Sequence, residues 1–207
     1  MNPWEDKTNT EKFPNRLKEK FPELIFISSF ADPAGIPEDL PHVCFMGRSN
    51  SGKSSLIASL CSNPGIVKTS RKPGHTKLLN VFRRDNVYII DMPGYGYAKI
   101  SKKERDNLSQ LINAYITTAR NLRGGFLLLD CKRPPEDEEF YIRDTLQEMH
   151  IPLLLLMTKV DRFNQKERAK LTKQMKELGK EFPHIVKVSA TKGVNLGYLN
   201  NFMKTLA

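Results

Sequence analysis

The sequence predicts an α/β fold: a mainly parallel sheet with one antiparallel edge strand and helices on both faces. From about residue 43 onward, short apolar segments alternate with longer amphipathic ones, the pattern of parallel strands joined by helical crossovers. Two strand-like segments are separated only by residues 83–86, a link that suits an antiparallel hairpin but is too short for a crossover. The expected strands are 43–46, 78–82, 87–90, 125–129, 152–157 and 185–188, and the expected helices are about 53–61, 104–121, 136–149, 165–181 and 194–205.

The chain of 207 residues is long enough for one α/β domain, expected over residues 22–207. Residues 1–21 are expected to be a flexible tail, because this start is polar and charged and contains Pro3 and Pro14. Residues 24–30 suit either an extra strand or a connector.

Composition limits the cellular location and the kinds of binding partner that we expect. Cys44, Cys61 and Cys131 lack metal-ligand or disulfide spacing, so a reducing cytoplasm is the simplest location. The polar start does not resemble a signal peptide, and the apolar run 151–157 is too short to span a bilayer, so no membrane association is expected. A net charge of +10 favours a polyanionic partner, although a merely soluble basic protein is the alternative.

Residues 47–54 carry the most specific motif of the sequence, G-x-x-x-x-G-K-[ST], between a strand-like and a helix-like stretch. In such a loop, backbone N–H groups and the helix dipole face a phosphate. The lysine can reach the β- and γ-phosphates, and the last hydroxyl can bind Mg²⁺. A Gly/Ser-rich turn that binds nothing is the alternative. The loop consists of Gly47, Arg48, Ser49, Asn50, Ser51, Gly52, Lys53 and Ser54.

Two later segments can respond to a γ-phosphate. Thr76, in a loop of Pro, Gly and Lys, offers Mg²⁺ a second hydroxyl, although loop threonines are common. Asp91 to Gly94 reads D-x-x-G at the end of a strand-like segment. Asp91 can hold a water on Mg²⁺, and the N–H of Gly94 can contact the γ-phosphate, a contact whose loss would release the loop. A plain strand-to-turn aspartate is the alternative. The predicted contacts here are Gly74, His75, Thr76, Lys77, Leu78, Asp91, Met92, Pro93 and Gly94.

A base-reading element follows the apolar run 153–157. The carboxylate of Asp161 can accept hydrogen bonds from the N1–H and 2-amino groups of guanine, which adenine lacks, so ATP is the less favoured nucleotide. The stem of Lys159 can cover the base, and the backbone N–H of Ala190 can donate to guanine O6. Thr158 stands where many GTPases have Asn, which predicts weaker contacts. The contact residues expected in this region are Thr158, Lys159, Val160, Asp161, Val188, Ser189 and Ala190.

The quoted strings resemble one family closely. Gly-Arg-Ser-Asn-Ser-Gly-Lys-Ser-Ser at 47–55, Lys-Pro-Gly-His-Thr at 72–76, Asp-Met-Pro-Gly-Tyr-Gly-Tyr-Ala at 91–98 and Thr-Lys-Val-Asp at 158–161 are similar to the bacterial EngB GTPases, in the Era-like branch of the translation-factor class. The resemblance covers about residues 22–207. It departs at Ser51, where Val is common, and at His75, where Arg is common.

The resemblance implies a Ras-like P-loop GTPase domain that binds GTP or GDP with Mg²⁺. It further implies a cytosolic role in assembly of the large ribosomal subunit, with a link to cell division and septation that can be secondary to failed assembly. A binding protein that uses GTP as a structural ligand and a direct division regulator are the alternatives.

Hydrolysis is expected to be slow. Tyr95 follows D-x-x-G where Ras-like enzymes place a water-orienting Gln, and tyrosine has no side-chain amide. We assign the chemistry to Lys53, Thr76, Gly94 and Asn50. Some Era-like enzymes use Asn at this place in the loop to ligate K⁺, so K⁺ stimulation is a hypothesis for Asn50; a local backbone cap is the alternative. The ribosome is the other candidate for stimulating GTP hydrolysis.

A basic cluster without acids lies in residues 66–84 and predicts contact with rRNA phosphates on the side of the γ-phosphate-responsive loops. The lysines of helix 165–181 are more simply a solvated face. No signature of base-specific RNA reading is present, DNA is not expected, and a monomer is the default. The cluster consists of Lys68, Arg71, Lys72, Lys77, Arg83 and Arg84.

Overall fold

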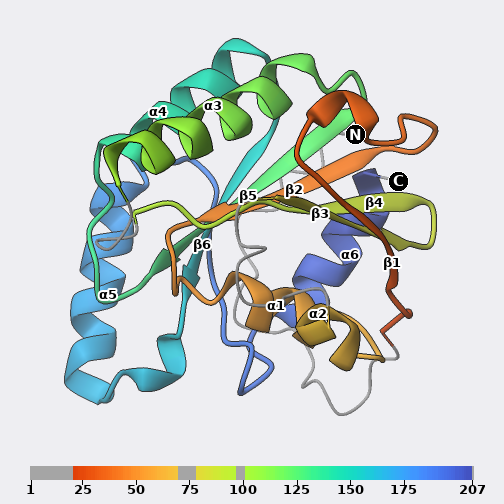
Figure 1. Cartoon of the computed structure of the whole chain (residues 1–207). Helices are drawn as coiled ribbons and strands as arrows, with labels where there is room; N and C mark the ends of the chain where they lie inside the picture. Colours follow the sequence, from red (N-terminus) through yellow and green to blue (C-terminus); the bar gives the residue numbers. More distant parts are fainter. Residues whose placement is uncertain (1–20, 70–77, 97–100, 207) are drawn as a thin grey trace.

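The computed structural model describes residues 21–69, 78–96 and 101–206. Except for its last residue, the tail predicted over residues 1–21 lies outside them. The described chain forms a seven-stranded sheet in the order β1-β3-β4-β2-β5-β6-β7 with helices on both faces (Figure 1). The predicted fold class is therefore confirmed.

The strands match the predicted segments closely. β3 is antiparallel to both of its neighbours, and the β2–β4, β2–β5, β5–β6 and β6–β7 pairs are parallel. The predicted hairpin is the β3–β4 pair, and segment 24–30 proves to be a strand that pairs along the outer side of β3. The strands are β1 (Ile25–Phe30), β2 (His42–Gly47), β3 (Leu79–Arg84), β4 (Val87–Asp91), β5 (Leu122–Asp130), β6 (Leu153–Thr158) and β7 (Ile185–Lys187).

The helices divide between the two faces of the sheet. α3, α4 and α5 cover one face, and α1, α2 and α6 cover the other (Figure 1). Capping boxes at Ser101, Glu136 and Asn164 begin α3, α4 and α5, each with a glutamate three residues later. The helices are α1 (Lys53–Ser59), α2 (Gly65–Thr69), α3 (Lys102–Thr118), α4 (Asp137–Glu148), α5 (Gln165–Leu178) and α6 (Leu196–Leu206).

Alternation along the central strands builds two apolar layers. Met46 of β2 faces the layer under α3 and α4, whereas its neighbour Phe45 faces the layer under α1 and α6. Phe45 packs on Phe126 of β5 with ring centroids 4.7 Å apart. Because β2, β4, β5 and β6 run in the same direction, the loops after their last residues meet at one edge of the sheet.

His42, the first residue of β2, is completely buried next to α3. Its Nε2 lies 2.8 Å from the carbonyl oxygen of Pro37, which can only accept, so Nε2 carries the proton. Its Nδ1 therefore accepts from the hydroxyl of Tyr115 at 3.0 Å. Burial lowers the pKa of His42, although the Pro37 carbonyl and the charges of Glu38 and Asp39 act in the opposite direction.

Stability is expected to depend on pH through His42. As the pH falls below about 6.5, the unfolded chain takes up a proton that folded His42 does not, so the free energy of unfolding decreases, by at most about 1.4 kcal/mol per pH unit. Urea unfolding of wild type and His42→Gln at pH 7.5, 6.5 and 5.5 measures this. The variant should lose most of the decrease, and exposed His150→Asn should keep it. Parallel curves for wild type and His42→Gln would contradict the assignment.

Candidate nucleotide site

The loop from Gly47 to Ser54 joins β2 to α1, the strand–loop–helix context that its motif requires. Gly47, Asn50 and Gly52 have φ angles of 153°, 62° and 97°, so this loop turns through left-handed backbone. A Cβ on Gly47 would lie 2.7 Å from the carbonyl oxygen of Leu128, so no larger residue fits there. Gly52 caps the N-terminus of α1, where free N–H groups can face an anion.

A buried ion pair links the start of α1 to the end of β4. Lys53 Nζ binds Asp91 Oδ1, and the two side chains are only 7% and 1% exposed. Ser54 is half-buried one residue further along α1. An ammonium, a carboxylate and a hydroxyl are thus gathered at the end of the glycine-rich loop, which is the donor set that a Mg²⁺-bound polyphosphate needs.

The segment after β4 lies directly on the glycine-rich loop. The N–H of Ser49 donates to the carbonyl oxygen of Tyr95 at 2.7 Å. A Cβ on Gly94 would lie 3.1 Å from the backbone N and Cα of Ser49, so glycine permits this close approach. Met92 and Pro93 are buried. D-x-x-G and the glycine-rich loop therefore form one packed unit.

Arg48 connects this unit to the start of α4. Its Nη1, Nη2 and Nε lie 2.7, 2.8 and 2.9 Å from carboxylate oxygens of Glu136, Glu138 and Glu139. Desolvation disfavours the charged guanidinium, but hydrogen bonds to Glu139 and Glu136 raise the pKa of Arg48 overall. Glu139 is completely buried and also accepts from the hydroxyl of Tyr95 at 2.8 Å. Burial, followed by the charge of Glu139, raises the pKa of Tyr95 well above its usual value.

This group of glutamates was not predicted from the sequence. The only signal was the spacing of Glu136 and Glu139, which suits a capping box. That spacing predicts the start of a helix, but it does not predict an arginine partner far away in the chain.

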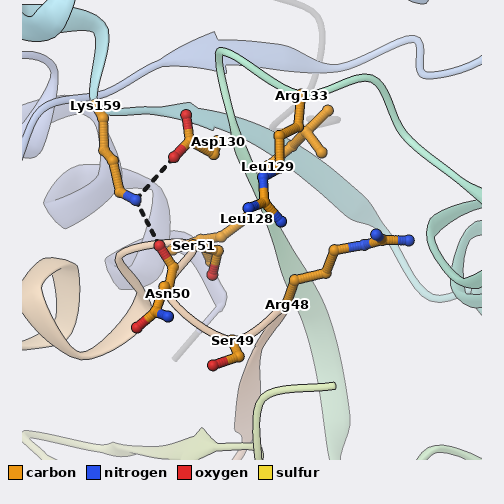
Figure 2. A pocket seen from close by; sticks show the side chains of 9 residues that line it. All are labelled: Arg48, Ser49, Asn50, Ser51, Leu128, Leu129, Asp130, Arg133 and Lys159. Atoms are coloured by element: carbon orange, nitrogen blue, oxygen red, sulfur yellow. Dashed lines mark hydrogen bonds and ion pairs between the residues drawn. The ribbon is translucent and has the colours of Figure 1, made fainter. Parts of the chain in front are cut away.

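The end of β6 ties the glycine-rich loop to β5. Thr158 Oγ1 lies 2.6 Å from the carbonyl oxygen of Ser51, to which it can donate. Figure 2 shows Lys159 between Asn50 and Asp130; its Nζ lies 2.5 Å from the carbonyl oxygen of Asn50 and 2.8 Å from Asp130 Oδ2. Desolvation opposes the charge of Asp130, but the bond from Lys159 lowers its pKa overall. Asn50, Ser51, Asp130 and Lys159 border a cavity of about 60 Å³ beside the loop.

Asp161 is held beside the loop after β7. Ser189 Oγ donates to Asp161 Oδ1 at 2.5 Å, and this bond is the main cause that lowers the pKa of Asp161. Ser189 Oγ in turn accepts from the N–H of Lys192 at 3.1 Å. Val188 is buried and Ala190 is half-buried. The two segments assigned to base reading therefore meet, with an ionised carboxylate between them.

Some predicted contacts fall elsewhere. Gly74, His75, Thr76 and Lys77 lie outside the described residues, and half-buried Leu78 precedes β3. The prediction that Arg84 contributes to an exposed basic face is wrong, because Arg84 is 2% exposed and its guanidinium binds Asn200 and Met203 of α6. Alternation along β3 turns Arg84 inward and leaves its neighbour Arg83 exposed.

The fold and this edge of the sheet define the class of P-loop GTPase domains. A family model described as "50S ribosome-binding GTPase" matches residues 42–159. The chain is 43% identical over 157 residues to the "Probable GTP-binding protein EngB" of Desulfatibacillum aliphaticivorans, covering 74% of this chain and 77% of the relative. It is 38% identical over 182 residues to the protein of the same name from Mesoplasma florum, covering 85% and 91%. The chain belongs to the EngB family of GTP-binding proteins.

Solved structures show the same fold. A crystal structure of a probable GTP-binding protein engB superposes with a TM-score of 0.67 at 24% identity, covering 80% of this chain and 97% of that one. Era in complex with MgGDPNP and nucleotides 1506–1542 of 16S ribosomal RNA has a TM-score of 0.58 at 21% identity, covering 82% and 57%. Within the described residues, none of the helices is both long and apolar enough to span a membrane.

Proposed function

We propose that this protein is a cytoplasmic guanine-nucleotide switch that hydrolyses GTP slowly and acts in assembly of the large ribosomal subunit. Membership of the EngB family and the description of the matching family model support the ribosomal part. One observation carries the nucleotide part: the Asp161 carboxylate, fixed by Ser189, lies at the same sheet edge as the loop that begins α1. A requirement in cell division and septation would follow from failed assembly.

In this proposal, Asp161 selects guanine. Its carboxylate accepts from N1–H and the 2-amino group, while Ser189 holds it in place and Ala190 donates its N–H to O6. The stem of Lys159 lies over the loop, with its Cε 3.7 Å from the position of a Cβ on Gly52. From there it can cover one face of the base, while its ammonium stays on Asn50 and Asp130. Thr158 contributes by binding the loop itself, not the base.

The phosphates would lie against residues 47–54, with Mg²⁺ held by Ser54, Thr76 and, through a water, Asp91. The oxygen donors Asp91 and Ser54 suit Mg²⁺. The described residues contain no cluster of three or more His, Cys, Asp or Glu side chains that could hold a metal, and a site of one carboxylate and two hydroxyls needs none. Mg²⁺ supplies charge neutralisation at the phosphates. Lys53 must move from Asp91 toward the β- and γ-phosphates, and Gly94 then contacts the γ-phosphate through its N–H.

The position of Tyr95 supports slow hydrolysis. Its hydroxyl is committed to Glu139, and its side chain is 5% exposed, so it has no free polar group with which to orient a water. GTP hydrolysis then depends on Lys53, Gly94 and Thr76, and on stimulation by K⁺ or by the ribosome.

Potassium is expected to raise GTP turnover by at least about tenfold over sodium at equal ionic strength, since a cation near the phosphates offsets charge in the transition state. The alternative of a local cap has no support, because within the described residues the side-chain amide of exposed Asn50 forms no hydrogen bond. Asn50→Gly is the best test of the K⁺ hypothesis, since glycine tolerates the φ of 62° and has no side-chain amide. Equal rates of GTP turnover in KCl and NaCl, together with an unchanged rate in Asn50→Gly, would contradict the hypothesis.

The ribosomal role is tested by co-sedimentation with separated subunits in GDP and in a non-hydrolysable GTP analogue. We expect binding to the large subunit with the analogue and release with GDP. Binding that is equal in both states would favour a protein that uses GTP as a structural ligand. A lack of binding in either state would overturn the ribosomal role and leave a direct division regulator as the better reading.

A further inference from the structure

A buried arginine lies at the end of the sheet opposite the glycine-rich loop. Arg84 ends β3, and the hairpin 85–86 leads into β4, beside the C-terminal end of α6 (Figure 1). Its Nη2 donates to Asn200 Oδ1, and its Nη1 lies 3.4 Å from the sulfur of Met203. Its Nε–H, although buried, has no acceptor in the described part of the chain. Buried polar groups are rarely left without a partner, so this N–H calls for a ligand.

The positive charge of Arg84 is also only weakly compensated. Its guanidinium makes no ion pair within the described residues, and both of its hydrogen-bond partners are neutral side chains. Burial lowers its pKa, although the charge of Asp85 acts in the opposite direction, and an arginine stays protonated in proteins. A buried cation without an ion-pair partner is costly, and a bound anion would offset that cost.

A cavity of about 190 Å³ lies beside Arg84. It is lined by Arg84, Asp85, Asn86, Val87, Met203 and Lys204. Exposed Lys204 brings a second cation to the rim, and Asn86 brings an amide. Asp85 is exposed and its carboxylate would repel an anion, so the ligand must sit toward Arg84 and Lys204.

The donor geometry selects the kind of anion. A planar carboxylate binds arginine best through two parallel bonds, one of them to a terminal nitrogen. Here both terminal nitrogens already have protein partners, so only Nε is free. Nε is covered in this conformation, so binding requires a small movement of the side chains over it, after which a tetrahedral oxyanion can place one oxygen on Nε and another on Lys204. We infer that the cavity between the β3–β4 hairpin and the end of α6 is a binding site for a phosphate group, held by Arg84 Nε and Lys204.

The test is a titration followed by NMR at the arginine Nε–H groups of the full-length protein. Saturating GDP keeps inorganic phosphate away from the glycine-rich loop, and Arg84→Lys assigns the Arg84 signal. Phosphate should shift this signal saturably. The Nε–H groups of Arg48 and Arg143, already bound to Glu139 and Asp144, should not move and serve as internal controls. Lys204→Ala should weaken phosphate binding by roughly tenfold, the loss of one charged hydrogen bond.

Two further additions separate the sources of the phosphate. A short oligoribonucleotide that shifts the Arg84 signal at lower concentration than inorganic phosphate would show that the site takes a nucleic-acid backbone. A shift with inorganic phosphate alone would show a site for free phosphate or a small phosphorylated molecule. An Arg84 Nε–H that phosphate does not move, or that acetate and chloride move equally at matched ionic strength, would overturn the proposal.

Discussion

Replacing Asp161 by Asn is expected to lower the affinity for GTP by at least about a hundredfold and to create affinity for xanthosine triphosphate. In the proposed site the carboxylate accepts two hydrogen bonds from guanine, and each bond to a charged acceptor contributes about 1.5–3 kcal/mol. The low pKa of Asp161, caused mainly by its bond from Ser189, keeps it ionised at neutral pH. An asparagine amide would instead present an N–H where guanine also has one.

Xanthine supplies the control for this prediction. It carries a carbonyl where guanine has the 2-amino group, so it can accept from the new amide. Competition of GTP, XTP and ATP against a fluorescent guanine nucleotide measures the change, with XTP against a fluorescent xanthine nucleotide for the variant. Restored binding of XTP would show that the variant is folded and that the base contacts changed. Undiminished affinity for GTP, or a loss that XTP does not restore, would contradict the role of Asp161.

Replacing Glu139 by Ala is expected to lower the free energy of unfolding by about 3 kcal/mol, since the loss of a buried ionic partner leaves the other charge uncompensated. The change removes the acceptor of Arg48 Nε and of the Tyr95 hydroxyl, both of which are poorly accessible to water. It also removes the acceptor of the Glu136 N–H at the start of α4. Arg48 keeps Glu136 and Glu138, so the cost should fall at the low end of the range for buried pairs.

Glu138→Ala is the matched control for this prediction. Glu138 also binds Arg48, at 2.8 Å, but its side chain is 48% exposed. Its loss should cost less than about 1 kcal/mol, as for other exposed ion pairs. Guanidinium chloride unfolding of the two variants measures the difference. Equal losses would show that burial of Glu139 is not what gives the network its strength.

The motifs were readable from sequence because each of them is local. Gly47 to Ser54 contains its own turn, and the apolar residues before and after it predict the strand and the helix. The meeting of Asp161 with Ser189 is consistent with the sequence pattern, since both follow the ends of neighbouring parallel strands within a few residues. The short helix α2, with only five residues, has too few turns to give a helical period and was missed.

Partners far apart in the chain were not readable in this way. Arg48 and Glu139 are separated by 91 residues, and neither local sequence predicts the contact with the other. Arg84 was wrongly assigned to the exposed basic cluster because that assignment followed its basic neighbours. The alternation of β3 instead turns its side chain toward Asn200. Thr158 was expected to contact the nucleotide more weakly than an asparagine would, and its bonding distance to the loop carbonyl of Ser51 was not predicted.

The central claim is that the edge bearing Lys53 and Asp161 binds guanine nucleotides. Isothermal titration calorimetry of the purified chain with GDP, a non-hydrolysable GTP analogue and an ATP analogue, each with Mg²⁺, tests it most directly. The account predicts one site per chain for each guanine nucleotide, no detectable heat from the adenine analogue, and loss of binding in Lys53→Met. Equal binding of the adenine analogue, or guanine-nucleotide binding that survives Lys53→Met, would contradict it.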